Sequence, residues 1–277
     1  MKNLFLLLFV FPFVLSAQDF GKYIEKHAIK IDSLYSLNSD VYEKIKDFDL
    51  IMVGEMHGTM EPAQLVFGLA NISVKNEGTV SVGIEIPRDE MATYLRNPSD
   101  SNVLESRFFS KPNNDGRNGE AWAQLIRNCQ ANSQIHVFFF DNVGEQQVSN
   151  RDSAMYLSLV EQKLKFPSDK IITLSGNIHN RTIPYKEIVT MGTYCMNDSV
   201  NFNQTKICSI AHQFSEGTML NNKGNGLETT TIEFQESVYS KSVPFSKYLL
   251  FFPMTDDYPN NCIFYTRKVN QSNEIHQ

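Results

Sequence analysis

A short apolar run that is followed at once by two ionisable side chains is the feature that most constrains the fold of this chain. Residues 50–53 are apolar and partly β-branched, a composition typical of a strand buried on both faces. Gly54 ends the run, Glu55 and His57 follow it, and Gly58 leads into a helical pattern. In open α/β sheets, ligands bind at the carboxyl ends of the strands. Taken alone, the stretch is explained as well by a structural role, with Glu55 as a helix cap and His57 as a packed imidazole, as by a functional site. Recurrence of the pattern further along the chain favours the functional site.

Three more segments have the character of buried strands, and helical patterns separate them. Residues 79–86, 135–140 and 170–174 are predicted strands. Alternating strands and helices predict an α/β fold, with a mostly parallel sheet, right-handed crossovers and helices on both faces. The predicted helices cover residues 19–37, 41–46, 61–78, 88–96, 120–131 and 149–165.

The carboxyl ends of these predicted strands carry ionisable side chains. Glu85 lies between two isoleucines, where a carboxylate is costly unless it is paired; an exposed sheet edge is the alternative. Asp141 follows the third strand. Residues 176–179 then repeat the Gly-x-x-His order of residues 54–57 and contribute His179. Because the carboxyl ends of parallel strands meet at one edge of a sheet, we expect an active site there.

The helix that begins near residue 150 adds a cation to this set. Ser149 as N-cap and Asp152 three residues later form a capping-box pattern, which gives Asp152 a structural task. Arg151 opposes the helix dipole by about 0.3–1 kcal/mol in the first turn. It is either a solvated side chain or one aimed at an anion or an active-site carboxylate, and we expect it to belong to the site.

The predicted site supports two mechanisms of hydrolysis. His57, Glu85 and His179 could hold a divalent metal with an open position, which would lower the pKa of bound water. Alternatively, one histidine acts as a general base on water and a carboxylate such as Glu55 orients it, without metal. In both mechanisms Arg151 would stabilise a developing oxyanion. Serine chemistry is disfavoured because the sequence contains no G-x-S-x-G, and it also lacks P-loop and dinucleotide-binding motifs.

Residues 1–17 have the pattern of a secretory signal peptide. Lys2 precedes an apolar run over residues 4–15, which is too short to span a bilayer, and Ser16-Ala17 supplies small residues for cleavage. We therefore expect an exported protein, periplasmic or secreted, with no integral membrane segment after cleavage. The net charge of −6 has no basic clustering, which argues against a nucleic-acid partner.

An exported chain is able to form disulfides, and the sequence contains four cysteines. Cys195 and Cys208 flank a polar segment and could close a hairpin between them. The pairing of Cys129 and Cys262 is left open. No C-x-x-C occurs, so a zinc ribbon or a thioredoxin-type motif is not indicated.

The last third of the chain is predicted to be β-rich. Its expected strands join the same sheet or an extension of it, and they cover residues 193–196, 206–214, 229–234, 248–252 and 262–267. The predicted organisation is a signal peptide (1–17), an α/β core (18–190) and the remaining strands with a β-rich extension of the same domain (191–277). Residues 97–119 are polar and proline-containing, and we expect them to form a mobile lid over the sheet.

The motifs described above resemble those of the superfamily that joins TIKI proteases, TraB/PrgY proteins, erythromycin esterases and ChaN-like haem-uptake proteins. That superfamily has two G-x-x-H motifs at strand ends, a Glu after the second strand and an Arg that opens a later helix. The resemblance spans residues 49–180, and the matching positions are residues 54–57, residues 176–179, Glu85 and Arg151. It implies that His57 and His179 bind metal or act as bases, that Glu55 and Glu85 are acidic partners, and that Arg151 stabilises an anion.

The resemblance implies more than one function. TIKI members are metal-dependent hydrolases, erythromycin esterases use a histidine base without metal, and the ChaN branch is linked to haem or iron uptake. The first hypothesis is therefore an exported hydrolase in which water attacks an ester or amide of a small-molecule or peptide substrate. The alternative is a haem- or iron-binding uptake protein without catalysis. A third hypothesis, an inactive interaction domain, is disfavoured by the intact Glu and His set; the oligomeric state is left open.

Overall fold

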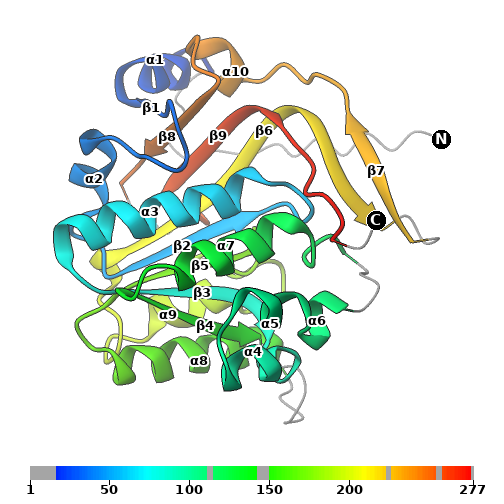
Figure 1. Cartoon of the computed structure of the whole chain (residues 1–277). Coiled ribbons are helices and arrows are strands. Elements are labelled where there is room, and N and C mark those ends of the chain that lie inside the picture. The colour runs from blue at the N-terminus through cyan, green and yellow to red at the C-terminus, as the bar shows by residue number, and fades with distance from the viewer. Residues whose placement is uncertain (1–16, 111–114, 142–149, 223–225, 254–257, 276–277) are drawn as a thin grey trace.

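A nine-stranded sheet, parallel through its centre, organises the molecule (Figure 1). The computed structural model describes residues 17–110, 115–141, 150–222, 226–253 and 258–275. The strands are β1 (Ile29–Lys30), β2 (Leu50–Glu55), β3 (Val80–Pro87), β4 (Ile135–Asp141), β5 (Lys170–Gly176), β6 (Ile207–Asn222), β7 (Leu227–Ile232), β8 (Lys247–Phe251) and β9 (Cys262–Val269). The helices are α1 (Ala17–His27), α2 (Ser39–Ile45), α3 (Glu61–Glu77), α4 (Ala92–Arg96), α5 (Asp100–Leu104), α6 (Arg107–Ser110), α7 (Glu120–Gln130), α8 (Arg151–Lys165), α9 (Met191–Asn197), α10 (Val238–Ser242) and the short 3₁₀ helices η1 (Arg88–Met91) and η2 (Gln204–Lys206).

The strand order places β5 between β2 and β3. The order is β1-β8-β9-β6-β2-β5-β3-β4, and β7 pairs with the long strand β6. Strands β9, β6, β2, β5, β3 and β4 run parallel, whereas β1, β7 and β8 pair antiparallel with their neighbours. The predicted α/β fold with a mostly parallel sheet is therefore confirmed. The loop after β5 consequently lies between the loops after β2 and β3.

Helices cover both faces of the sheet because its central strands are apolar on both faces. Along β2, Ile51 and Val53 belong to the hydrophobic cluster that includes side chains of α3 and α7. Leu50 and Met52 belong to a second cluster with side chains of α8 and α9. All four β2 residues are fully buried, which requires the uninterrupted apolar run seen in the sequence. The predicted helices on both faces are confirmed (Figure 1).

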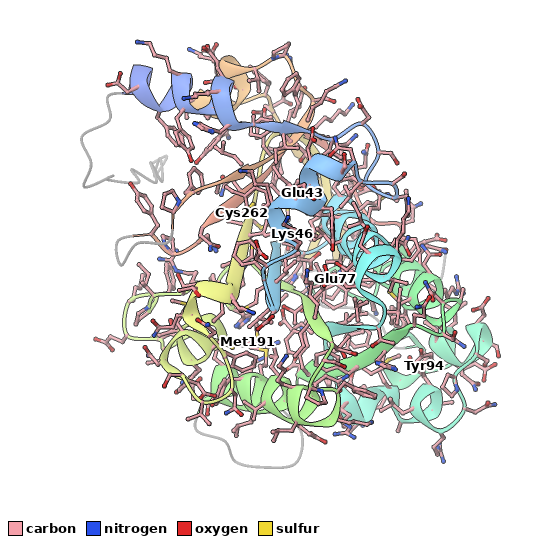
Figure 2. All side chains as sticks on the ribbon, turned by 90° about the vertical axis from the view of Figure 1, so that its left-hand side faces the viewer. Glu43, Lys46, Glu77, Tyr94, Met191 and Cys262 are labelled. Carbon is pink, nitrogen blue, oxygen red and sulfur yellow. The ribbon has the colours of Figure 1, made fainter. Side chains whose placement is uncertain are left out.

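A buried lysine fixes the opposite, amino end of the sheet. Lys170, the first residue of β5, donates through Nζ to the backbone oxygens of Ile45 (2.9 Å) and Lys46 (3.3 Å) and to Glu77 Oε1 (2.6 Å). Figure 2 shows Lys46 and Glu77 on neighbouring elements at this end of the molecule. An ammonium group is tolerated in the interior only when it is paired and hydrogen-bonded, and these acceptors meet that need.

Two predicted elements are wrong. The predicted helix over residues 19–37 ends at His27, because the chain then pairs with β8, where Ile29 is opposite Leu249 and Ile31 N donates to Lys247 O. The predicted strand over residues 193–196 lies inside helix α9. Its N-cap, Thr190, accepts a hydrogen bond from the backbone of the first turn, and tertiary burial of the helix overrides the β-propensity of the segment.

The disulfide that the sequence left possible between Cys195 and Cys208 is not formed. All four cysteines are free and buried. Cys195 lies on α9 in the cluster that α8 and α9 form, whereas Cys208 lies on β6 in the cluster of α3 and α7. The sheet therefore separates the two sulfur atoms.

The predicted lid and the predicted signal peptide are described only in part. The segment over residues 97–119 contains helices α5 and α6, which bury Val103, Phe108 and Phe109, so its described part is packed on the core. Residues 111–114 and the predicted signal peptide up to residue 16 lie outside the described residues. Within the described ranges, no helix is long and apolar enough to cross a membrane.

The turn after β2 provides a test of the packing between the core and the C-terminal strands. Gly58 has φ +85°, and a Cβ there would lie 1.9 Å from Leu220 O of β6. Gly78 has a similar φ of +103° and nothing within 4 Å of such a Cβ. We expect Gly78→Ala to cost about 1 kcal/mol of unfolding free energy through backbone strain alone, and Gly58→Ala to cost roughly 2 kcal/mol more through the clash. Urea unfolding measures both; equal losses would contradict the close approach of β6.

Candidate active site

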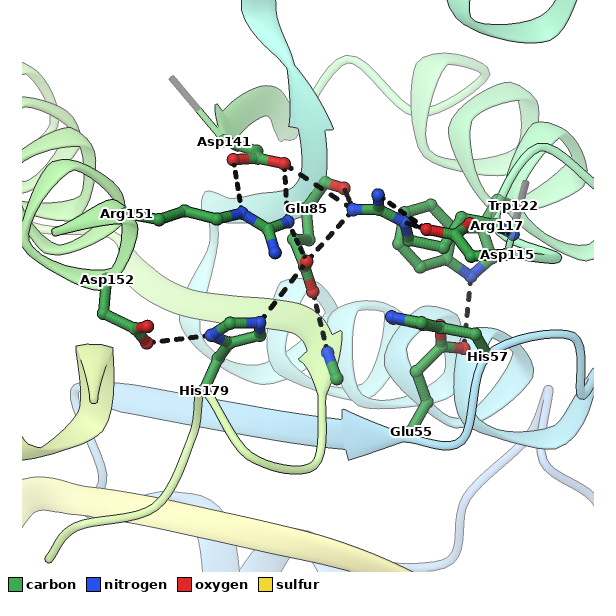
Figure 3. Close-up of polar contacts among 11 residues, drawn as sticks. Glu55, His57, Glu85, Asp115, Arg117, Trp122, Asp141, Arg151, Asp152 and His179 are labelled. Carbon is green, nitrogen blue, oxygen red and sulfur yellow. Dashed lines mark hydrogen bonds and ion pairs between the residues drawn. The ribbon is translucent and has the colours of Figure 1, made fainter. Parts of the chain in front are cut away.

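Ionisable side chains from several segments of the chain converge at the carboxyl edge of the parallel strands (Figure 3). Strands β2, β3 and β4 contribute Glu55, Glu85 and Asp141 at or near their ends, and the loop after β5 contributes His179. Arg151 is the first residue of α8. Because β5 lies between β2 and β3, the loop that carries His179 lies in the middle of this edge.

Glu55 and His57 form an oriented acid–base pair. His57 Nδ1 lies 2.7 Å from Glu55 Oε1, and Trp122 Nε1 donates to Glu55 Oε2 at 3.2 Å. Glu55 is buried, whereas 29% of the His57 side chain is exposed. A carboxylate on Nδ1 places the proton of the neutral imidazole on that nitrogen, which leaves Nε2 as an acceptor.

His179 forms a second pair of the same kind, but its carboxylate comes from a distant helix. His179 Nδ1 lies 2.8 Å from Asp152 Oδ1, which also accepts a hydrogen bond from Met191 N at 2.8 Å. Asn150, not Ser149, is the N-cap of α8, and Ser149 lies outside the described residues. The purely structural task that the sequence suggested for Asp152 is therefore wrong.

Gly176 lies directly between the two imidazoles. A Cβ at this position would lie 3.3 Å from His57 Cε1, 3.5 Å from His57 Nε2 and 3.6 Å from His179 Cδ2. A side chain at residue 176 would therefore contact both imidazole rings at once. The glycine of the second G-x-x-H motif keeps the floor between them free of a side chain.

Glu85 is the buried centre of the charge network. It is fully buried, so the alternative of an exposed edge is wrong. Its Oε1 accepts hydrogen bonds from Arg117 Nη1 (3.0 Å) and Arg151 Nη2, and its Oε2 accepts one from Gly176 N (2.8 Å). His179 Nε2 lies 3.7 Å from the same Oε1. One carboxylate thereby ties β3, β5, α8 and the loop before α7 together.

Two further carboxylates hold the guanidinium groups in place. Asp141 receives Arg151 through two parallel hydrogen bonds, from Nε to Oδ1 (3.0 Å) and from Nη2 to Oδ2 (2.7 Å). Asp115 receives Arg117 through Nε at 2.8 Å, and Arg117 Nη1 also donates to the backbone oxygen of Glu85 at 3.1 Å. Bidentate pairing of this kind fixes the plane of a guanidinium as well as its position.

The charges of the site lower the pKa of Glu85. Burial by itself raises the pKa of this carboxyl group, but the positive charges of His179, His57, Arg117 and Arg151 outweigh burial and lower the pKa to about 2. Glu85 is therefore ionised at every pH at which the protein is expected to work. It acts as a fixed negative charge and not as a proton donor.

The same network raises the pKa of His57. Burial lowers the pKa of the imidazole, but the hydrogen bond and charge of Glu55, together with the charge of Glu85, raise it above the usual 6.5, while Arg117 opposes them. An imidazole with a raised pKa is a stronger base once it is deprotonated.

The expected metal ligands His57, Glu85 and His179 do not fit a divalent metal in this geometry. Both carboxylate oxygens of Glu85 already accept hydrogen bonds, and the guanidinium groups of Arg117 and Arg151 beside it would repel a second cation. Among the described residues, no group of three His, Cys, Asp or Glu side chains is arranged to hold a metal ion. The three side chains already have other partners: each imidazole is oriented by a carboxylate, and the carboxylate of Glu85 is paired with guanidinium groups.

The structure adds residues to the site that the sequence analysis did not select. Asp141 is not one of them, because the sequence already placed it at a strand end; the structure adds its role, which is to hold Arg151. Trp122 is the only tryptophan of the chain, but composition gives no reason to place it beside Glu55. Asp115 and Arg117 lie in the predicted lid, and nothing in the local sequence marks them.

Comparisons with known proteins show what this fold resembles. No protein-family model matches the sequence, and no curated protein matches it. A Bacillus cereus protein superposes with a TM-score of 0.68 at 11% identity over 95% of this chain and 100% of that chain. A succinoglycan biosynthesis protein superposes with a TM-score of 0.65 at 11% identity, over 93% of this chain and 98% of that chain. The erythromycin esterase mutant EreC in its open conformation superposes with a TM-score of 0.61 at 11% identity, over 86% of this chain and 95% of that chain. The resemblance to the erythromycin esterase group is thus confirmed at the level of the fold.

Replacing Glu85 should alter the acid limb of the stability curve. Its pKa of about 2 in the folded protein lies below the ordinary 4.5, so its stabilisation, of the order of 3 kcal/mol, is fully present above pH 4.5 and is lost as the pH falls towards 2. Glu85→Gln should flatten this loss and cost about 3 kcal/mol at pH 7, because two partly buried guanidinium groups lose a charged partner. Urea unfolding across pH tests this. Glu43→Gln, at an exposed pair with Lys46, is the control and should change little; an unchanged acid limb in Glu85→Gln would contradict the network.

Replacing Glu55 should change the titration of His57 alone. Glu55→Gln removes the charge that raises the pKa of His57, so we expect this pKa to fall. Imidazole proton–carbon NMR spectra recorded over a pH series measure it directly. Asp152→Asn, which removes the carboxylate of the other histidine, is the matched control and should leave the titration of His57 in place. A shift of equal size in both variants would mean that the two pairs are not separate.

Proposed function

We propose that this protein is a hydrolase in which His57 activates water for attack on the carbonyl carbon of an ester or amide. The observation that carries the proposal is the presence of two imidazoles on either side of Gly176, each with Nδ1 fixed by its own carboxylate. Such a pair supplies the base and the acid that hydrolysis requires. The fold shared with an erythromycin esterase supports this class of reaction by analogy.

His57 is assigned the role of general base. Its Nδ1 is bound to Glu55, so Nε2 accepts the proton of the attacking water, and the hydroxide oxygen bonds to the carbonyl carbon as that proton leaves. Glu55 stabilises the imidazolium that forms. Trp122 holds the second oxygen of Glu55 and thereby keeps the carboxylate in position beside the ring.

His179 is assigned the role of general acid. Asp152 holds its Nδ1, and its Nε2 lies 3.7 Å from Glu85 Oε1, on the side of the ring that faces the centre of the site. When the tetrahedral intermediate collapses, Nε2 donates its proton to the leaving oxygen or nitrogen. Proton exchange with solvent then returns both imidazoles to their starting states.

Arg151 is the donor available for the developing oxyanion. Its Nε and Nη2 are bound to Asp141 and Glu85, whereas Nη1 has no hydrogen-bond partner among the described residues. Arg117 uses Nε, Nη1 and Nη2 on Asp115 and Glu85. A preorganised guanidinium N–H aimed at an oxyanion contributes several kcal/mol in a site that excludes water, about 3–4 kcal/mol for a single well-placed donor.

The metal-dependent and haem-binding alternatives are less well supported by this site. A metal held through Glu85 would have to displace two guanidinium groups. A haem needs an apolar slot beside its axial ligand, and both imidazoles instead stand among carboxylates and guanidinium groups. Export of the protein remains a prediction from the sequence.

Substitution of the two histidines tests the proposal. His57→Asn should lower kcat/KM for p-nitrophenyl esters at least about hundredfold, because it removes the base. His179→Asn should cause a loss of similar size for alkyl esters and amides, whose leaving groups need a proton. His27→Asn, at an exposed position on α1, is the matched control and should leave the rate unchanged. We expect EDTA to leave the wild-type rate unchanged. Full activity of both site variants would refute the proposal, and a rate restored only by added Zn²⁺ would favour the metal-dependent version.

A further inference from the structure

Two exposed apolar side chains stand next to the two histidines. Met56 is 44% exposed and directly precedes His57, and Ile178 is 45% exposed and directly precedes His179. They occupy the same position in the two G-x-x-H motifs. A single exposed apolar residue needs no explanation, but the same exposure at both equivalent positions calls for one.

The two motifs are held side by side by the sheet. Strands β2 and β5 are hydrogen-bonded neighbours with Glu55 opposite Gly176, and Asn177 N donates to Glu55 O at 3.0 Å beyond the last strand pair. Met56 and Ile178 therefore follow the sheet at the same edge, one residue beyond Glu55 and two beyond Gly176. We name these two residues the apolar rim.

The charges beneath the apolar rim disfavour an anionic ligand. Among the described residues the site holds five carboxylates against the two guanidinium groups of Arg117 and Arg151. Negative charges therefore exceed positive ones by three while both imidazoles are neutral, and by two while His179 carries the proton that it donates. Both guanidinium groups pair with these carboxylates, which leaves Arg151 Nη1 for the oxyanion that forms during the proposed reaction. The carboxylates are those of Glu55, Glu85, Asp115, Asp141 and Asp152.

We infer that the site takes esters or amides that have an apolar acyl body and no negative charge, with the apolar rim as the acyl contact. This inference rests on the proposed function, because it places the reacting carbonyl between the two imidazoles. Met56 and Ile178 remove apolar acyl surface from water, and the excess of carboxylates excludes acyl groups that end in a carboxylate. The rim residues therefore set specificity and take no part in proton transfer.

The single tryptophan makes ligand binding measurable without any reaction. Trp122 donates to Glu55, and its ring centroid lies 6.3 Å from that of His57. Its fluorescence should report occupancy of the site by three unreactive amides: butanamide, octanamide and the monoamide of octanedioic acid. We expect octanamide to bind at least tenfold more tightly than butanamide, and the anionic monoamide at least tenfold more weakly than octanamide.

Near-isosteric variants test the apolar rim. Met56→Gln combined with Ile178→Thr should reduce the preference for octanamide over butanamide at least fivefold. Leu157→Asn combined with Leu164→Asn, at exposed positions on α8, is the control and should leave the preference unchanged. An unchanged preference in the rim variant, or a monoamide that binds as tightly as octanamide, overturns the inference.

Hydrolysis assays keep this inference separate from the proposed function. If octanoyl and butanoyl p-nitrophenyl esters are hydrolysed with equal kcat/KM by a His57-dependent reaction, the proposed function holds and the apolar rim fails. If neither His57→Asn nor His179→Asn slows hydrolysis while Trp122 fluorescence still shows the rim-dependent preference, the rim stands as a binding surface and the hydrolase proposal fails.

Discussion

The interaction on which the rest of the site depends is the burial of the Glu85 carboxylate among cations. An ionised carboxylate without access to water is tolerated only when its lone pairs are used and its charge is balanced. Arg117, Arg151 and the backbone N–H of Gly176 satisfy these conditions. Each partner comes from a different segment, so satisfying one buried charge positions the loop before α7, the first turn of α8 and the end of β5.

The strand order of the sheet brings the partners of Glu85 and the two histidines to the same edge. The fourth strand of the repeating pattern, β5, is inserted between the first and second, so its G-x-x-H loop lies between the loops of β2 and β3. Hydrophobic periodicity identifies strands and the end at which ligands bind, but strand order depends on contacts between segments far apart in the chain. The sequence therefore predicted which side chains meet, namely Glu55, His57, Glu85, Arg151 and His179, without predicting which of them lies in the centre.

The residues that the sequence did not reveal are those positioned by long-range packing. Arg117 follows Gly116, where a Cβ would lie 2.6 Å from Leu220 O of β6 and 2.9 Å from Cα of Gly58 in the turn after β2. Segments far apart in the sequence thus fix the path of one short loop. The stretch is polar and rich in turn residues, so it has the appearance of a free loop when read locally. Local composition carries no information on such a contact.

The two histidine pairs differ in origin, and this difference argues for different roles. Glu55 is two residues from His57 in the same loop, so this pair forms whenever β2 ends correctly, and it raises the pKa of the imidazole. Asp152 belongs to α8, and its contact with His179 exists only when α8, α9 and β5 are assembled. The local pair is suited to accept a proton from water at the exposed side of the site. In the proposed hydrolysis, the assembled pair supplies the second oriented imidazole, which faces the leaving group.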